Sequence, residues 1–130
     1  MANNYETPYV WLIYSSERTD NIPELTACFP GSTIRKIGIR NGCLKNSTDY
    51  YRYARIKKLK VLLYDSIGNV FTEWISLPDI YSTEYYVKPL SRSYTDILRV
   101  EFWLESFYYK ENEDNGHKYL LYVSDIQFWQ

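Results

Sequence analysis

Hydrophobic and polar residues alternate with a period of two along most of this chain. From Leu98 to Leu104 every second residue is apolar, and the positions between them hold charged residues or Trp103. Successive side chains of a β-strand point to opposite faces, so this pattern predicts a strand with one buried and one exposed face. No stretch of ten or more residues combines a helical period with capping residues. The alternation therefore predicts an all-β protein.

The same pattern predicts seven strands, each followed by turn signals. They cover roughly Tyr9–Ser15, Ile34–Arg40, Ile56–Tyr64, Val70–Leu77, Glu84–Val87, Ile97–Tyr108 and Tyr119–Trp129. The residues expected to face the core in three of them are Leu59, Val61, Leu63, Phe71, Ile75, Leu77, Leu98, Val100, Phe102 and Leu104. The residues expected to face outward include Lys58, Lys60 and Trp74.

Turn residues set the expected connections. Asp65–Asn69 predicts a tight hairpin, since Gly68 can adopt the positive φ that such turns need. Pro30, Pro78 and Pro89 are expected at strand ends, where a missing N–H costs no ladder hydrogen bond. Seven short strands favour a two-sheet antiparallel β-sandwich of jelly-roll type, formed by residues 1–130 as a single domain.

Four long irregular connections remain between the predicted strands. They are Ser16–Thr33, Asn41–Ala54, Lys88–Thr95 and Lys110–Lys118. Binding and catalytic residues concentrate on such loops, so the candidate chemistry is sought there first.

The amino-acid composition favours a binding function. The chain holds 15 tyrosines, four tryptophans and five phenylalanines, but one histidine and two cysteines. Tyrosine combines a rigid apolar face with a polar tip, which suits a binding module better than proton chemistry. The formal net charge of −1 gives no basic footprint for nucleic acid, and no 18-residue apolar stretch predicts a transmembrane segment. Cys28 and Cys43 match no metal or redox motif, which favours free thiols while allowing a disulfide.

Candidates for catalysis are few and each has a plainer interpretation. The lone His117 lies in a polar tip rather than near a predicted apolar pocket. Glu101 and Glu105 flank Trp103 on one strand face, but exposed strand carboxylates are usually solvated rather than an acid–base pair. The acidic tip from Glu111 resembles a calcium loop, yet its twelfth position is Tyr122 instead of glutamate. The sequence therefore predicts no enzyme activity.

An ordered set of motifs carries a family resemblance over residues ~25–129. They are Ile34-Arg-Lys-Ile-Gly-Ile-Arg-Asn-Gly42, Tyr53-Ala-Arg55-Ile-Lys-Lys-Leu-Lys-Val61, Val100-Glu-Phe102 and Val123-Ser-Asp-Ile-Gln-Phe128. In their order and spacing they resemble the discoidin, or factor V/VIII type C, galactose-binding-like superfamily. Within it, the chain is most similar to the glycan-binding domain found beside bacterial NAD glycohydrolase toxins, sometimes named a translocation domain. Arg55, which opens a strand, is expected to hold carbonyl groups of the preceding loop.

The resemblance implies a galactose-binding-domain-like fold, carbohydrate as the ligand, and a secreted or cell-surface location. It also implies a weak candidate for calcium at Asp125, where the family usually has glutamate; other cofactors are not expected. Cys43 stands where the family usually has tyrosine, and Tyr53 where it often has asparagine. Only Thr7-Pro-Tyr-Val-Trp11 matches the family's N-terminal calcium loop, so a domain trimmed from a longer chain is expected.

The candidate sugar site follows from the rings that fall on irregular segments. Relatives bind sugar with loops at one end of the sandwich, which implies the Asn41–Ala54 loop. Aromatic rings would contact the sugar face and polar side chains its hydroxyl groups. The candidate ligand-binding residues are Asn46, Asp49, Tyr50, Tyr51, Arg52, Tyr53, Tyr94 and Tyr108, with Tyr109 beside the last of them at the mouth of the acidic tip.

Trp74 and Trp103 project from predicted outward strand faces and form a second candidate surface. Exposed aromatic residues on a sheet often cover a partner protein or a second subunit. The sequence thus leaves two functions open. One is a non-catalytic, lectin-like carbohydrate-binding module that targets a larger protein to glycans; the other is a protein-interaction or homodimer domain without sugar affinity.

Overall fold

The computed structural model describes residues 9–14, 23–109 and 118–130. Its strands are β1 (Tyr9–Tyr14), β2 (Leu25–Asn41), β3 (Arg55–Asp65), β4 (Val70–Ser76), β5 (Tyr86–Tyr108) and β6 (Lys118–Trp129), and its one helix in the described residues is α1 (Ser47–Arg52). Every pair of neighbouring strands is antiparallel. The predicted all-β, antiparallel fold is confirmed.

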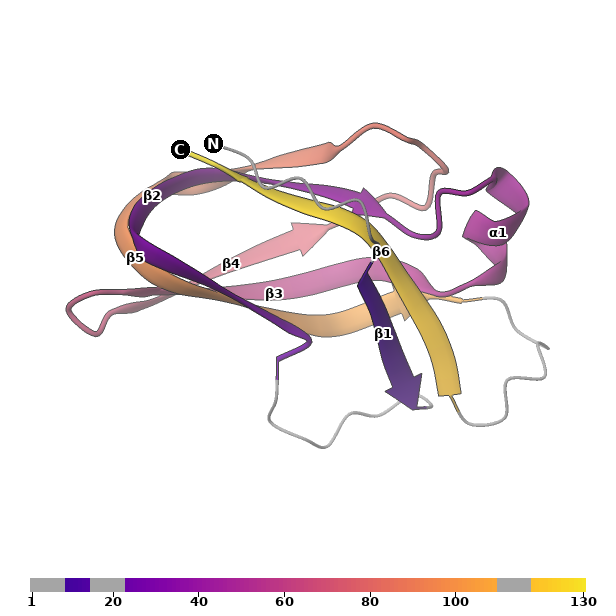
Figure 1. Ribbon diagram of the computed structural model, residues 1–130, viewed down its shortest axis with the longest axis horizontal. Helices are drawn as coiled ribbons and strands as arrows, with labels where there is room; N and C mark the ends of the chain where they lie inside the picture. The colour runs from indigo at the N-terminus through magenta and orange to yellow at the C-terminus, as the bar shows by residue number, and fades with distance from the viewer. Residues whose placement is uncertain (1–8, 15–22, 110–117) are drawn as a thin grey trace.

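The six strands form one continuous sheet with the order β1-β6-β2-β5-β3-β4. β2 and β5 are long and bend sharply together, so that the sheet folds over on itself (Figure 1). The second half of β2 pairs with β6 and with the start of β5, whereas the second half of β5 pairs with β3. Two separate sheets, as in the predicted sandwich, are not confirmed, because hydrogen bonds join all six strands.

The bend is built from irregular strand pairing. Register shifts between Cys28 and Lys36 leave residues of β2 and β5 without a direct partner, and extra residues of this kind bend a strand and increase its twist. Asp96 adopts φ 55°, in the left-handed region that aspartate tolerates. Pro30 and Pro89 lie inside these long strands at the irregular segment, not at strand ends as predicted.

Three of the predicted boundaries between strands and loops are wrong. β2 begins at Leu25, within the predicted Ser16–Thr33 loop. The predicted Lys88–Thr95 loop belongs to β5, which joins the two strands expected at Glu84–Val87 and Ile97–Tyr108. The Asn41–Ala54 loop is interrupted by α1, a helix of six residues that is too short to show a period.

The core lies between the two halves of the folded sheet. Phe102 of β5 and Phe128 of β6 meet across it, with ring centroids 5.9 Å apart. Most residues predicted to face inward are buried, among them Leu59, Val61, Leu63, Ile75, Leu77, Val100 and Phe102. Leu98 is the exception at 43% exposed, because it is the extra residue of a bulge between the pairs Tyr64–Arg99 and Asp65–Ile97.

The predicted hairpin between β3 and β4 is confirmed. Asp65 N–H donates to the Asn69 carbonyl at 3.1 Å, and Gly68 has φ 92°. Both cysteines are free, Cys28 exposed and Cys43 half-buried. The only helix of the described residues is too short to cross a membrane.

Candidate functional site

The end of the molecule that carries α1 gathers three segments: the loop from β2 to β3, the 77–85 loop from β4 to β5, and the end of β2 (Figure 1). α1 forms because Asn46 caps it. The Asn46 Oδ1 accepts a hydrogen bond of 2.8 Å from the Asp49 backbone N–H, an interaction that satisfies a free donor of the first turn. The helix ends at Tyr53, which returns to an extended conformation.

Arg55 joins α1 to the 77–85 loop. Arg55 is 5% exposed, and its guanidinium makes a bidentate pair with Asp79, with Nε–Oδ1 at 2.7 Å and Nη2–Oδ2 at 2.8 Å. The Tyr50 hydroxyl donates to the same carboxylate at 3.2 Å. Bidentate arginine–carboxylate pairs are strong and fix geometry. We call Arg55, Asp79 and Tyr50 the Arg55 cluster.

The Arg55 cluster also fixes the backbone around α1. Arg55 Nη1 donates to the carbonyls of Tyr51 and Tyr53 at 3.4 and 3.2 Å, as the sequence predicts for this position. The hydrogen bonds from Arg55 lower the pKa of Asp79 below its usual range. Burial, followed by the charge of Asp79, raises the pKa of the Tyr50 phenol. At neutral pH the cluster is therefore an ion pair capped by a neutral phenol.

Gly42 is required where β2 leaves the sheet. It has φ 81°, and a Cβ atom added there would lie 2.5 Å from Cδ1 of the Tyr50 ring. Any other residue would strain the backbone and displace that ring. The Asn41-Gly42 pair thus allows Tyr50 to pack against the end of β2.

A second set of polar contacts holds the other end of the 77–85 loop. The Tyr85 hydroxyl donates to the Asp125 carboxylate of β6, and Gln127 Nε2 donates to the Tyr85 oxygen at 2.8 Å. Asp125 is 2% exposed and Gln127 6% exposed. Burial and the hydrogen bond to Asp125 raise the pKa of the Tyr85 phenol. We call Tyr85, Asp125 and Gln127 the Asp125 cluster.

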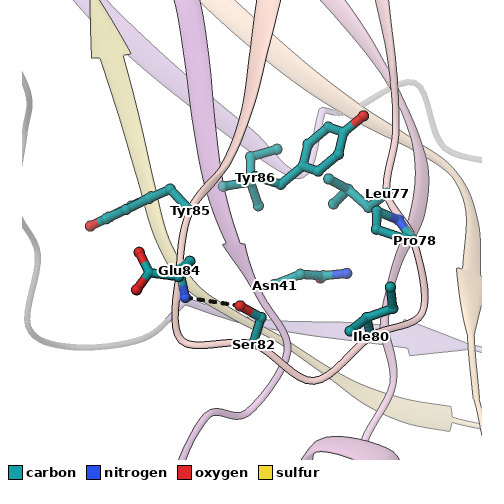
Figure 2. A pocket seen from close by; sticks show the side chains of 9 residues that line it. Asn41, Leu77, Pro78, Ile80, Ser82, Glu84, Tyr85 and Tyr86 are labelled. Carbon is teal, nitrogen blue, oxygen red and sulfur yellow. Dashed lines mark hydrogen bonds between the residues drawn. The ribbon is translucent and has the colours of Figure 1, made fainter.

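Between these two clusters the loop encloses a pocket of about 250 Å³, here called the loop-end pocket. Figure 2 shows Asn41 in the middle, with Leu77, Pro78 and Ile80 on one side and Glu84 and Tyr85 on the other. Ile39, Ser82 and Tyr86 complete the lining.

Most of the pocket wall is apolar, and five of its residues are exposed, among them Ile80 at 63% and Tyr86 at 41%. Asn41 is not free to bind a ligand, because it donates to the Ile56 carbonyl at 2.8 Å and accepts from the Ile56 N–H at 2.9 Å. Ser82 Oγ accepts from the Glu84 N–H at 3.1 Å. An apolar wall with a few polar groups is the usual composition of a small-molecule site.

Comparison with known proteins adds one finding. No protein-family model matches the chain, and no curated protein matches it. Among solved structures, the NMR structure of the Streptococcus pyogenes NAD+-glycohydrolase translocation domain is similar, with a TM-score of 0.60, over 84% of this chain and 88% of that domain. The two chains share a fold. At 24% identity the likeness shows no more than that.

This shared fold confirms the sequence resemblance to that domain at the level of architecture. Membership of the discoidin superfamily stays a prediction, since neither comparison by sequence matches it.

The structure brings most of the predicted sugar-binding residues together at the α1 end. Tyr51 is 44% exposed and is the freest ring among them. Arg52 lies over the ring of Tyr53, 5.6 Å from its centroid, and the half-buried Tyr53 packs on Tyr122 at 4.7 Å. Tyr108 is half-buried and donates its hydroxyl to the Leu77 carbonyl at 2.9 Å.

Two of the predicted rings are not free. Tyr50 is fully buried, because its ring packs over Gly42 and its hydroxyl belongs to the Arg55 cluster. Tyr94 is 3% exposed and lies in the bend of β5, where its hydroxyl donates to the buried Glu73. Their expected role as ligand platforms is wrong, since a ring inside the core cannot face a ligand.

The pocket residues themselves were not predicted. The sequence patterns assign only the ends of Pro78-Asp-Ile-Tyr-Ser-Thr-Glu-Tyr85, Pro78 to a strand end and Glu84-Tyr85 to a short strand, although the polar residues and two tyrosines of this segment are a loop signal. Nothing local indicates that Asp79 and Tyr85 reach partners 24 and 40 positions away.

The described part of the chain does not support a calcium site. There, no three His, Cys, Asp or Glu side chains come together to hold a metal ion. The residues around Asp125 do not fit calcium, which takes six to eight oxygen ligands, because Asp125 is already bound by Tyr85. His117 and the acidic tip from Glu111 lie outside the described residues.

Proposed function

We propose that this chain is a non-catalytic carbohydrate-binding module whose ligand occupies the loop-end pocket. The single observation that carries the proposal is the pocket itself, which is held open by the Arg55 cluster at one end of its loop and the Asp125 cluster at the other. A preformed site avoids the cost of ordering a loop when the ligand binds.

The side chains of the pocket suit a sugar. The exposed Tyr86 ring and Ile80 offer an apolar surface for the C–H face of a pyranose, and the Ser82 hydroxyl and Glu84 carboxylate offer polar partners for its hydroxyl groups. Tyr51, exposed on the neighbouring helix, supplies a further ring at the same end. These groups select and orient a ligand, and none of them is paired for acid–base catalysis.

The similar structure supports an accessory role. It is the translocation domain of an NAD+-glycohydrolase, a part named for transport rather than for the reaction. By analogy, we propose that this chain targets a larger secreted or surface protein to glycans.

A glycan array tests this function directly, probed with the wild-type protein with and without calcium. Replacing Tyr86→Ala is expected to lower binding roughly tenfold, the scale of losing one stacked ring. Tyr51→Ala tests the helix, and Ile67→Ala, which removes an apolar side chain 83% exposed in the hairpin between β3 and β4, is the control. No bound glycan at any concentration, or equal losses in all three variants, would overturn the proposal.

The alternative of a protein-binding or homodimer face around Trp74 and Trp103 makes a different prediction. Trp74 is 45% exposed on the edge strand β4, and an exposed ring at a sheet edge favours a contact with another protein at this face. Sedimentation of the wild-type protein tests it, since a homodimer through this face would be lost in Trp74→Ala.

A further inference from the structure

The outward side chains of β4, β3 and the second half of β5 form a second aromatic surface, here called the outer face. Lys60 of β3 pairs in register with Trp74 of β4 on one side and with Trp103 of β5 on the other. Neighbouring strands are about 4.8 Å apart, so the Cα atoms of the two tryptophans are separated by about 10 Å across the lysine. Across the three strands these side chains form a row of an indole, an ammonium group and a second indole.

Two ammonium groups lie against these indoles. Lys58 Nζ is 4.8 Å from the Trp74 ring centroid, and Lys60 Nζ is 5.5 Å from that of Trp103. Among the described residues neither lysine forms an ion pair with a carboxylate. Cation–π contacts at exposed sites stabilise weakly and leave the positive charge available to a ligand.

One of the two acidic groups of the outer face, Glu101, is already engaged. Glu101 accepts hydrogen bonds from the Tyr64 hydroxyl at 2.9 Å and from Trp103 Nε1 at 3.2 Å, and it pairs with Arg99 at 3.2 Å. Its charge is therefore balanced within the face. Glu105, exposed on the same face, carries the other negative charge, so Lys58, Lys60 and Arg99 leave one positive charge in excess beside two rings, which favours an anionic partner.

A second copy of this chain does not fit the centre of the outer face. A two-fold axis through the middle of the row would place Lys60 against Lys60 of the copy, and like charges facing each other oppose association. The flat row instead suits a polymer that offers sugar rings and acidic groups in alternation. Its span is close to two pyranose units of an extended polysaccharide.

We propose that the outer face binds an acidic polysaccharide, with sugar rings on Trp74 and Trp103 and an acidic group between them at Lys58 and Lys60. This site is separate from the loop-end pocket, and it shares with the proposed function only the class of ligand.

The indole N–H signals in a two-dimensional 15N–1H NMR spectrum test the site, because the chain has four tryptophans. The probes are a hyaluronan octasaccharide, which carries a carboxylate on every second sugar, and a neutral chitin-type oligosaccharide. Hyaluronan is expected to shift the signals of Trp74 and Trp103 and to leave that of Trp129 unchanged, whereas the neutral oligosaccharide shifts none of them.

The double variant Lys58→Ala/Lys60→Ala should weaken hyaluronan binding roughly fivefold, since each exposed ion pair contributes little. Arg35→Ala/Lys45→Ala removes the same charge from exposed positions outside the row and should change the affinity less than twofold. Tyr86→Ala should bind hyaluronan like the wild type. This variant therefore tests the proposal for the loop-end pocket separately from the proposal for the outer face.

Three results would overturn the proposal. They are the absence of any indole shift, an equal shift with the neutral oligosaccharide, and equal losses in the two double variants. Binding to phosphatidylserine vesicles without hyaluronan binding would assign the outer face to a lipid surface instead, and a Trp74-dependent dimer would assign it to self-association.

Discussion

The loop end and the outer face each hold an arginine–carboxylate pair, but the arginine is buried at the loop end and exposed in the outer face. In the Arg55 cluster Arg55 is 5% exposed, whereas 32% of the side chain of its carboxylate partner Asp79, which lies in the 77–85 loop, is exposed. In the outer face 45% of the Arg99 side chain is exposed, whereas only 12% of the side chain of its partner Glu101 is exposed. A buried arginine depends on its carboxylate partner and so fixes the loop that carries it, whereas an exposed arginine can be solvated without its partner and adds little stability.

The largest difference is expected when each ion pair is broken. Asp79→Ala leaves the buried Arg55 guanidinium without its partner and should lower the free energy of unfolding by about 3 kcal/mol. Arg99→Ala breaks the exposed pair and should cost less than about 1 kcal/mol. Urea unfolding of both variants measures the two values. Equal costs would show that burial does not separate the two regions.

Two glycines differ in a similar way, one packed against a ring at the loop end and the other open to solvent in the hairpin between β3 and β4. Gly42 and Gly68 both have positive φ, but an added Cβ would lie 2.5 Å from the Tyr50 ring at Gly42 and would meet nothing within 4 Å at Gly68. Gly68→Ala should cost about 1 kcal/mol of backbone strain. Gly42→Ala adds overpacking and should cost about 2 kcal/mol more. Thermal unfolding compares them; similar melting temperatures would mean that Tyr50 is not held closely against β2.

The pH dependence should be the smallest effect. The hydrogen bonds from Arg55 lower the pKa of Asp79 in the folded protein. The unfolded chain therefore binds a proton first, near its ordinary pKa of about 4, and the stability that this pair contributes above that pH is lost as the pH falls through the lower folded value. Urea unfolding in steps below pH 5 should show a shallower decline for Asp79→Ala than for the wild type. Identical slopes for the two proteins would show that Asp79 does not contribute to the pH dependence of stability.

The regular strands were predictable because their signal is local. Alternation placed Val61 and Ile75 inward and Trp74 outward, and the structure agrees at all three positions. The prediction for Leu98 is wrong because a bulge interrupts the alternation there, so that Ile97 is buried in its place while Val100 and Phe102 keep their predicted face.

The candidate site was predictable only in part. Arg55 was expected to hold loop carbonyls, and it does. Its stronger partner, Asp79, comes from a loop that local sequence patterns do not connect to β3. Tyr50 looked free because it lies in an irregular segment, but its burial depends on the long-range contact with Asp79 and on Gly42. Position in a loop therefore does not establish that a ring is exposed.

The central claim is that a glycan binds in the loop-end pocket. The most direct test is the map of backbone amide shifts in the 15N-labelled protein when the strongest glycan of the array is added. The account predicts that the changes concentrate in residues 78–86, and that Tyr86→Ala weakens them. Changes confined to α1 around Tyr51, changes confined to the outer face, or no changes at all would contradict it.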